Sequence, residues 1–157
     1  PGESHDESAR RELAEETGIE VPLSVMERAK VGVLQFTFAD STTKMIVYLY
    51  RLNVHISSLL SSSSDVVTTA TAENTAETSF FPLDPSVVRG CDEITPQWYE
   101  DWYDIPLNNM FADDSVWLTH LLENTKDDLL LDGYFHFHPG GQTTNQIVHH
   151  FVHARSK

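Results

Sequence analysis

Short runs of β-branched and aromatic residues lie in both halves of the chain, and helical patterns stand before and between them. The runs predict strands at residues 31–38, 44–52, 94–102, 133–138 and 146–153. The first two strands are expected to form one hairpin, and the last two a second hairpin across Pro139, Gly140 and Gly141. Because strands that alternate with helices pack in layers, the sequence predicts an α/β fold with a mixed sheet.

The first helix carries both a start signal and a stop signal. Ser4 and Glu7 have the spacing of a capping box, good helix formers continue to Glu16, and Gly18 follows as a stop. A second helix is predicted from a cap at Asp113-Asp114-Ser115 to about residue 123.

A length of 157 residues is typical of one domain. Residues 56–80 differ from the rest, because 12 of these 25 positions are Ser or Thr and bury too little apolar surface to offset their ordering entropy. We therefore expect a single domain over residues 1–157 with a mobile surface insertion at about 56–80.

The chain has 24 acidic and 10 basic side chains, which gives a net charge of −14. Binding to a nucleic-acid polymer depends mostly on cations that replace condensed counterions, so no such partner is expected. A small nucleotide remains compatible when a divalent cation stands between its phosphates and the carboxylates. No apolar run is long enough to span a membrane, so no membrane partner is expected either.

Cys91 is the single cysteine, which leaves no intramolecular disulfide and no cysteine-based zinc set. This usage fits a reducing compartment, and we expect an intracellular, cytoplasmic monomer. A targeting segment before Pro1 would lie outside this sequence.

Three carboxylates share one face of the first predicted helix. Glu12, Glu15 and Glu16 stand at positions i, i+3 and i+4, so their side chains lie close together and repel one another. Arg11 stands four residues before Glu15 and can neutralise part of this charge. The spacing is compatible with a solvated acidic face and also with a site for Mg²⁺ or Mn²⁺.

A longer string that contains this cluster resembles a known motif. Glu3 is followed, after seven residues, by Arg11-Glu12-Leu13-Ala14-Glu15-Glu16-Thr17-Gly18-Ile19. This string resembles the box of the Nudix hydrolases, G-x5-E-x7-R-E-U-x-E-E-x-G-U with U aliphatic, at every fixed position from the first Glu onward.

The resemblance implies a Nudix α/β/α sandwich and a loop–helix–loop that binds Mg²⁺, with Mn²⁺ as a substitute. Glu15 and Glu16 would be ligands, Glu12 a further ligand or a base, and Arg11 and Glu3 would brace the group. The leading Gly of the box and the first strands of the domain would precede Pro1, so we expect an N-terminally truncated domain.

Later stretches resemble, in order and character, one group within this family, the oxidised purine nucleoside triphosphate hydrolases. They lie at residues 35–38, 91–98, 110–117 and 133–137. The resemblance implies that Glu93 is a fourth carboxylate of the metal site, as a ligand or a base. It also implies a purine pocket, for which we expect the residues Phe36, Phe38, Phe111, Asp113, Asp114 and Trp117.

The expected activity is Mg²⁺-dependent cleavage of oxidised purine nucleoside triphosphates, such as 8-oxo-dGTP and 2-hydroxy-dATP, to the monophosphate and pyrophosphate. Two alternatives remain open. One is a Nudix hydrolase for another nucleoside diphosphate derivative, such as a methylated purine nucleotide or a nucleotide sugar. The other is a nucleotide-binding module without catalysis.

Overall fold

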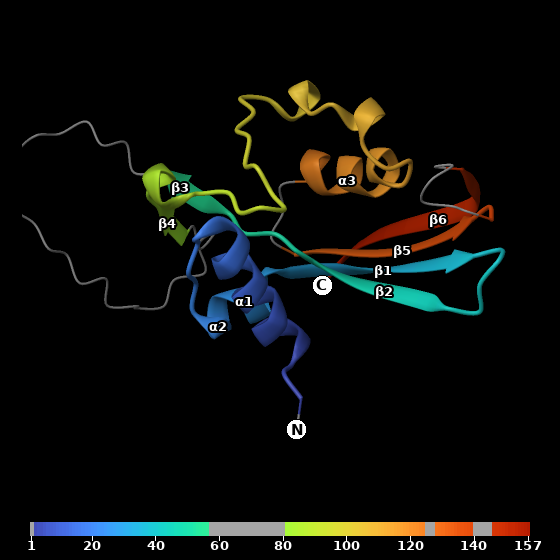
Figure 1. Cartoon of the computed structure of the whole chain (residues 1–157), viewed down its shortest axis with the longest axis horizontal. Coiled ribbons are helices and arrows are strands. Elements are labelled where there is room, and N and C mark those ends of the chain that lie inside the picture. The colour runs from blue at the N-terminus through green and yellow to red at the C-terminus, as the bar shows by residue number, and fades with distance from the viewer. Residues whose placement is uncertain (1, 57–80, 125–127, 140–145) are drawn as a thin grey trace, which may run out of the picture.

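The computed structural model describes residues 2–56, 81–124, 128–139 and 146–157. The expected insertion lies outside these residues except for Ile56, and so does most of the expected turn at residues 139–141. The elements, in chain order, are α1 His5–Thr17, α2 Leu23–Ala29, β1 Lys30–Phe38, β2 Lys44–Tyr50, β3 Val54–Ile56, β4 Phe81–Leu83, α3 Asp114–Glu123, β5 Leu129–Phe137 and β6 Ile147–Ser156 (Figure 1).

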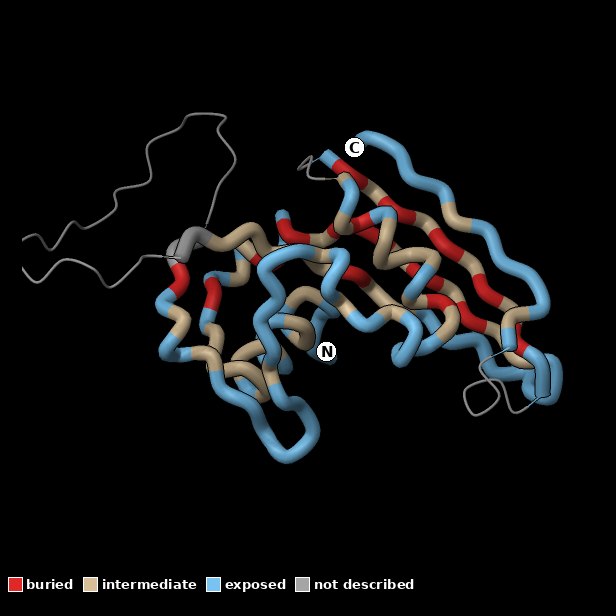
Figure 2. The backbone as a smooth tube through the Cα atoms, turned by 90° about the horizontal axis from the view of Figure 1, so that it is seen from above, coloured by how far each residue is buried: buried red, intermediate tan, exposed pale blue. Residues whose placement is uncertain are grey.

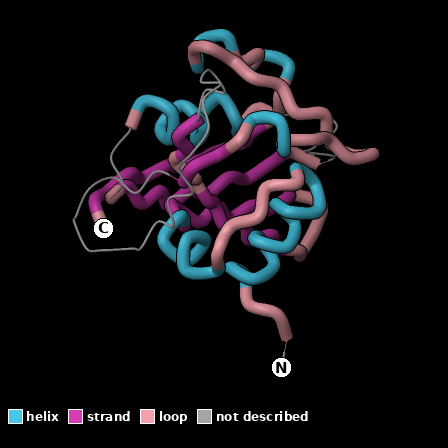
Figure 3. Tube along the Cα trace, turned by 90° about the vertical axis from the view of Figure 1, so that its left-hand side faces the viewer, coloured by secondary structure: helices cyan, strands magenta, loops and turns pink. Residues whose placement is uncertain are grey.

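Four of the strands form one mixed sheet in the order β2-β1-β5-β6. Strand β1 pairs antiparallel with β2 and parallel with β5, and β5 pairs antiparallel with β6. Helix α3 lies on one side of the sheet, while α1 and α2 lie on the other side, near the end of the sheet where β1 begins (Figure 1). The strands therefore run through the middle of the molecule (Figure 3). The α/β fold and the mixed sheet are confirmed, and the arrangement agrees with a Nudix sandwich.

The main core lies between the sheet and α3. The residues of β5 alternate between buried and half-buried along the whole strand, as expected for a strand with one face against a core (Figure 2). Leu131 and Phe135 have no exposed surface, and Leu34 of β1 is 1% exposed. A second, smaller core joins Met26 and Ala29 of α2 to partly buried apolar residues of α1.

Helix α1 begins and ends where its signals predict. The Ser4 hydroxyl accepts a hydrogen bond from the Glu7 amide, and the Glu7 carboxylate accepts one from the Ser4 amide, which completes the capping box. Gly18 ends the helix with a φ of 75°. A Cβ at this position would lie 2.7 Å from the Val87 carbonyl oxygen, so glycine is required by conformation and by space.

The strand predicted at 94–102 is wrong. Residues 94–101 form no strand, and a short 3-10 turn follows at Trp102–Asp104. Trp98 is 57% exposed and Ile94 is 37% exposed, so their β propensity is not matched by a partner strand. Pro96 also lacks the amide that a ladder would need.

Helix α2 and the parallel pair of β3 with β4 were not predicted from the sequence. Both are short, since α2 has seven residues and each strand has three. Among the residues that the structure describes, no helix is long and apolar enough to cross a membrane.

Candidate active site

An aromatic pocket of about 230 Å³ lies between α3 and the face of the sheet that α3 covers. Every residue that we predicted for substrate binding lines it. The full lining is Leu34, Phe36, Phe38, Met45, Val47, Leu49, Phe111, Asp113, Asp114, Trp117 and Phe137. Sequence reasoning missed Met45, Phe137 and the aliphatic lining residues. The hairpin of β1 with β2 was predicted, but only strand register shows which side chains of β2 face the pocket, and the pairing of β1 with β5 was not predicted.

Stacked rings form the floor of this pocket. Phe36 and Phe38 are two residues apart on β1, so both point to the same face of the sheet. The parallel register places Phe38 beside Phe137 of β5, with ring centroids 5.7 Å apart, and Phe36 stacks on Phe135 at 5.5 Å. Such a floor offers a flat apolar surface on which a purine can stack.

Two adjacent carboxyl groups face this floor from the start of α3. Asp113 is 8% exposed, and among the described residues it is the one charged side chain that is buried. Its Oδ2 accepts a hydrogen bond from Trp117 Nε1 at 3.1 Å. Asp114 Oδ2 accepts one from the Phe111 amide at 3.0 Å. Asp113 stands at the N-cap position, but its carboxyl group makes no capping hydrogen bond, so that part of the expected cap is wrong.

Burial raises the pKa of Asp113 above its usual value, because a charged carboxylate loses water there. The pKa of Asp114 is raised by burial first and by the neighbouring Asp113 charge second. Adjacent carboxyl groups with raised pKa values can share one proton, so that one donates and the other accepts a hydrogen bond.

The acidic face of α1 is organised around Arg11. Its guanidinium forms ion pairs with Glu3 at 3.1 Å, with Glu12 at 2.8 Å and with Glu15 at 2.8 Å. The Glu3 carboxylate, and after it that of Glu12, raises the pKa of Arg11, so the guanidinium stays fully charged. All four side chains are at least 41% exposed, so the pairs contribute little to stability and their value lies in placing carboxylates.

Helix α1 is held to the sheet by contacts at its first turn. The Tyr50 hydroxyl donates to Asp6 Oδ1 at 2.7 Å, and the His5 ring stacks on Tyr48 with centroids 4.1 Å apart. Burial is the main reason why the pKa of Tyr50 is raised, so the phenol stays protonated and keeps donating. Strand β2 thereby contributes to the aromatic pocket and also orients the helix that carries the glutamates.

Comparison with known proteins supports the resemblance found in the sequence. No protein-family model matches the chain. It is 30% identical over 149 residues to a Danio rerio protein named oxidized purine nucleoside triphosphate hydrolase, which covers 95% of this chain and 69% of that protein. A Mus musculus protein of the same name is 30% identical over 125 residues, or 80% of this chain and 58% of that protein. The chain belongs to the Nudix hydrolase family. It spans about two thirds of one relative and less of the other.

The glutamates of α1, Glu12, Glu15 and Glu16, have the donor chemistry of a magnesium site. Hard divalent cations prefer carboxylate oxygens, and three carboxylates pair with one guanidinium here, which leaves a surplus of negative charge. Within the parts of the chain that the structure describes, no three His, Cys, Asp or Glu side chains are already arranged to hold a metal ion. Glu16 is half-buried and takes no part in the described Arg11 ion pairs. The metal role of these residues therefore stays a prediction.

Glu93 lies on a loop that is hydrogen-bonded to the end of α1. The Arg89 amide donates to the Thr17 carbonyl at 2.9 Å, in the last turn of α1. The loop then turns tightly, with the Cys91 amide bonded to the Ile94 carbonyl at 3.0 Å, and Glu93 is exposed at this turn. Its role as a fourth carboxylate stays a prediction.

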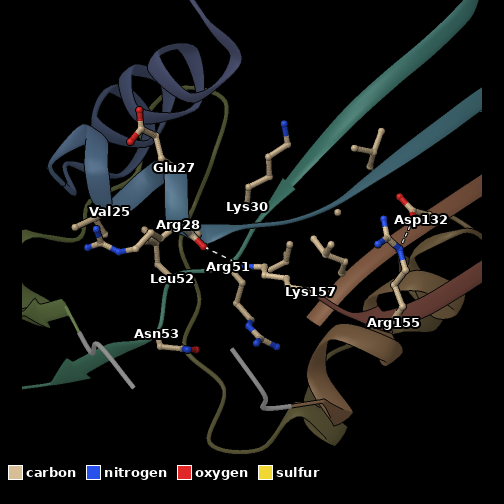
Figure 4. A pocket seen from close by; sticks show the side chains of 15 residues that line it. Val25, Glu27, Arg28, Lys30, Arg51, Leu52, Asn53, Asp132, Arg155 and Lys157 are labelled. Carbon is tan, nitrogen blue, oxygen red and sulfur yellow. Dashed lines mark hydrogen bonds and ion pairs between the residues drawn. The ribbon is translucent and has the colours of Figure 1, made fainter. Parts of the chain in front are cut away.

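A second cleft, of about 630 Å³, contains none of the predicted site residues. Its basic lining residues are Arg28, Lys30, Arg51, Arg155 and Lys157 (Figure 4). Several of these cations already have partners inside the protein: Arg155 pairs with Asp132 at 3.2 Å, and Lys30 lies 4.0 Å from the centre of the Tyr48 ring. Sequence reasoning missed this cleft because its residues come from both ends of the chain.

Proposed function

We propose that the chain hydrolyses oxidised purine nucleoside triphosphates to the monophosphate and pyrophosphate with the help of Mg²⁺. The observation that carries this proposal is the pair Asp113 and Asp114 beside an aromatic floor. The names of the Danio rerio and Mus musculus relatives support the same substrate class.

Oxidation rearranges the donors and acceptors on the edge of a purine. In 8-oxoguanine, N7 carries a hydrogen and becomes a donor, whereas in guanine it is an acceptor. A carboxyl pair that shares one proton offers both a donor and an acceptor to such an edge, while the base stacks on Phe36 and Phe38. The same pair can bind 2-hydroxyadenine in another orientation.

The triphosphate would lie toward α1. Glu12, Glu15 and Glu16, with Glu93 from the neighbouring loop, would hold Mg²⁺ or Mn²⁺, which supplies charge neutralisation at the phosphate oxygens when bound. A carboxylate of this group would accept the proton of the attacking water. Arg11 would keep Glu12 and Glu15 within reach of each other, as its two 2.8 Å ion pairs do here.

The test measures hydrolysis of 8-oxo-dGTP, 2-hydroxy-dATP, dGTP and ADP-ribose by the 157-residue chain, each over a titration of Mg²⁺ or Mn²⁺. The nucleoside monophosphate formed is followed in every case, together with pyrophosphate for the triphosphates and ribose 5-phosphate for ADP-ribose. We expect turnover of the two oxidised nucleotides, less of dGTP, and none without a divalent cation. Preferred hydrolysis of ADP-ribose would refute the substrate class. Binding of 8-oxo-dGTP without release at any metal concentration would instead favour a nucleotide-binding module.

A further inference from the structure

Arg51, just after β2, donates hydrogen bonds to both α2 and α3. Its amide donates to the carbonyl of Ala29, the last residue of α2, at 2.8 Å. Its guanidinium Nη1 donates to the Leu121 carbonyl at 3.1 Å and also to the Asn124 carbonyl. Leu121 lies in the last turn of α3, and Asn124 is the residue that ends it.

These contacts place a positive charge at the negative end of α3. The last carbonyls of a helix lack partners within the helix, and a cation there is stabilised by the helix dipole. Hydrogen bonds from a charged donor are stronger than neutral ones. Among the described residues of α3, Leu121 alone is buried, while Val116 and Trp117 are partly buried, so apolar packing holds this helix only in part.

The opposite end of α3 carries the carboxyl pair of the aromatic pocket. Leu121 follows Asp113 by eight residues, which is about 12 Å along a helix. On a lever of that length, a tilt of about 5° at the Arg51 end moves the carboxyl groups by about 1 Å. Displacements of this size at a binding site can change rates by about 100-fold.

We propose that Arg51 is a positioning residue for base recognition, which it serves by fixing α3 so that Asp113 and Asp114 face the aromatic floor. This inference rests on the proposed function for its kinetic test. Arg51 lines the basic cleft rather than the aromatic pocket, so it acts through α3 and need not touch the nucleotide (Figure 4).

The test compares Arg51→Met with Arg155→Met and Arg51→Lys. Arg155 lines the same cleft and carries the same guanidinium group, but its described ion pair is with Asp132 of β5. Replacement of Arg155 is therefore the matched control. For Arg51→Met we expect KM for 8-oxo-dGTP to rise about tenfold, or about 1.4 kcal/mol, with kcat within about twofold of the wild type. The ratio of kcat/KM for 8-oxo-dGTP to kcat/KM for dGTP should fall as this KM rises. Arg51→Lys should recover part of the loss, and Arg155→Met should behave as the wild type.

A second measurement needs no turnover. Amide hydrogen exchange in residues 114–123 should become faster in Arg51→Met, and the affinity for the product 8-oxo-dGMP should fall by a factor similar to the KM change. If the wild type releases no pyrophosphate, the proposed function fails, while these two readouts still test the role of Arg51. Should Arg51→Met not fold, Arg51→Gln keeps a donor without the charge and serves in its place. The inference is overturned by unchanged exchange and affinity in the Arg51 variant that folds, by an equal loss in Arg155→Met, or by a fall in kcat with KM unchanged.

Discussion

The hydrogen bond between Trp117 and Asp113 makes a quantitative prediction about how stability depends on pH. In Trp117→Phe the buried Asp113 loses the indole donor at 3.1 Å. A hydrogen bond to a charged group contributes about 1.5–3 kcal/mol, so we expect the free energy of unfolding at pH 7 to fall by about that amount. The smaller ring adds a packing loss that does not depend on pH.

The pH dependence follows from the pKa of Asp113. Burial already raises this pKa above the ordinary value of 3.8, and the Trp117 hydrogen bond opposes the rise. Its removal therefore raises the pKa of Asp113 further. A group whose pKa is raised by folding gives its full stabilisation below 3.8 and loses it as the pH rises through the folded value. The difference between wild type and Trp117→Phe should thus be largest near neutral pH and should shrink as the pH falls toward 3.8.

The assay is urea unfolding, followed by far-ultraviolet circular dichroism, at several pH values between 4 and 7. Trp98→Phe is the matched control, because Trp98 is 57% exposed and lies outside the pocket. We expect this control to change stability by less than about 0.5 kcal/mol at every pH. A Trp117→Phe effect that is the same at all pH values, or one that Trp98→Phe reproduces, would refute the reasoning about Asp113.

Three further predictions concern the glutamate face, the turn after α1 and the carboxyl pair. Glu15→Gln should lower kcat at least about 100-fold and weaken Mg²⁺ activation, because a neutral amide replaces a carboxylate that we propose as a metal ligand, whereas Glu27→Gln should keep normal turnover. Gly18→Ala should lower the free energy of unfolding by more than about 1 kcal/mol in a urea titration, since φ is 75° and the added carbon would lie 2.7 Å from a carbonyl oxygen. Gly2→Ala is the control and should leave this free energy unchanged, because its added carbon meets nothing within 4 Å. Affinity for 8-oxo-dGMP, measured by calorimetry, should fall as the pH rises through the raised pKa values of Asp113 and Asp114. Asp114→Asn should flatten this pH profile. A profile that keeps its slope in the variant would contradict a shared proton.

The elements with complete local signals were the ones predicted best. Helix α1 has its cap and its stop within 15 residues of each other in the chain, so neither depends on tertiary contacts. The stretch at 94–102 shows the opposite case, because a strand exists only when a neighbouring edge accepts it. Helix α2 is short and has no side-chain cap, and its stability comes from the burial of Met26 and Ala29. No local sequence pattern predicts that burial.

The site followed the same division. Aromatic and acidic residues within recognisable stretches were predicted and do line the pocket, whereas Met45 and Phe137 joined it through strand register. The contact between Arg51 and Leu121 joins positions 70 residues apart, so sequence spacing could not reveal it. Whether the glutamates and Glu93 meet around a metal ion depends on side-chain directions that the charge of a bound ion would itself influence.

The parallel pairing of β1 with β5 decides when the binding site can exist during synthesis. Phe36 and Phe38 leave the ribosome about 100 residues before their partners Phe135 and Phe137, and no local contact can replace those partners. Contacts of such long range form late and slow the folding of a domain. A nascent chain that stops before β5 would therefore contain the whole acidic segment of α1 while Phe36 and Phe38 still lacked their partners and were open to water.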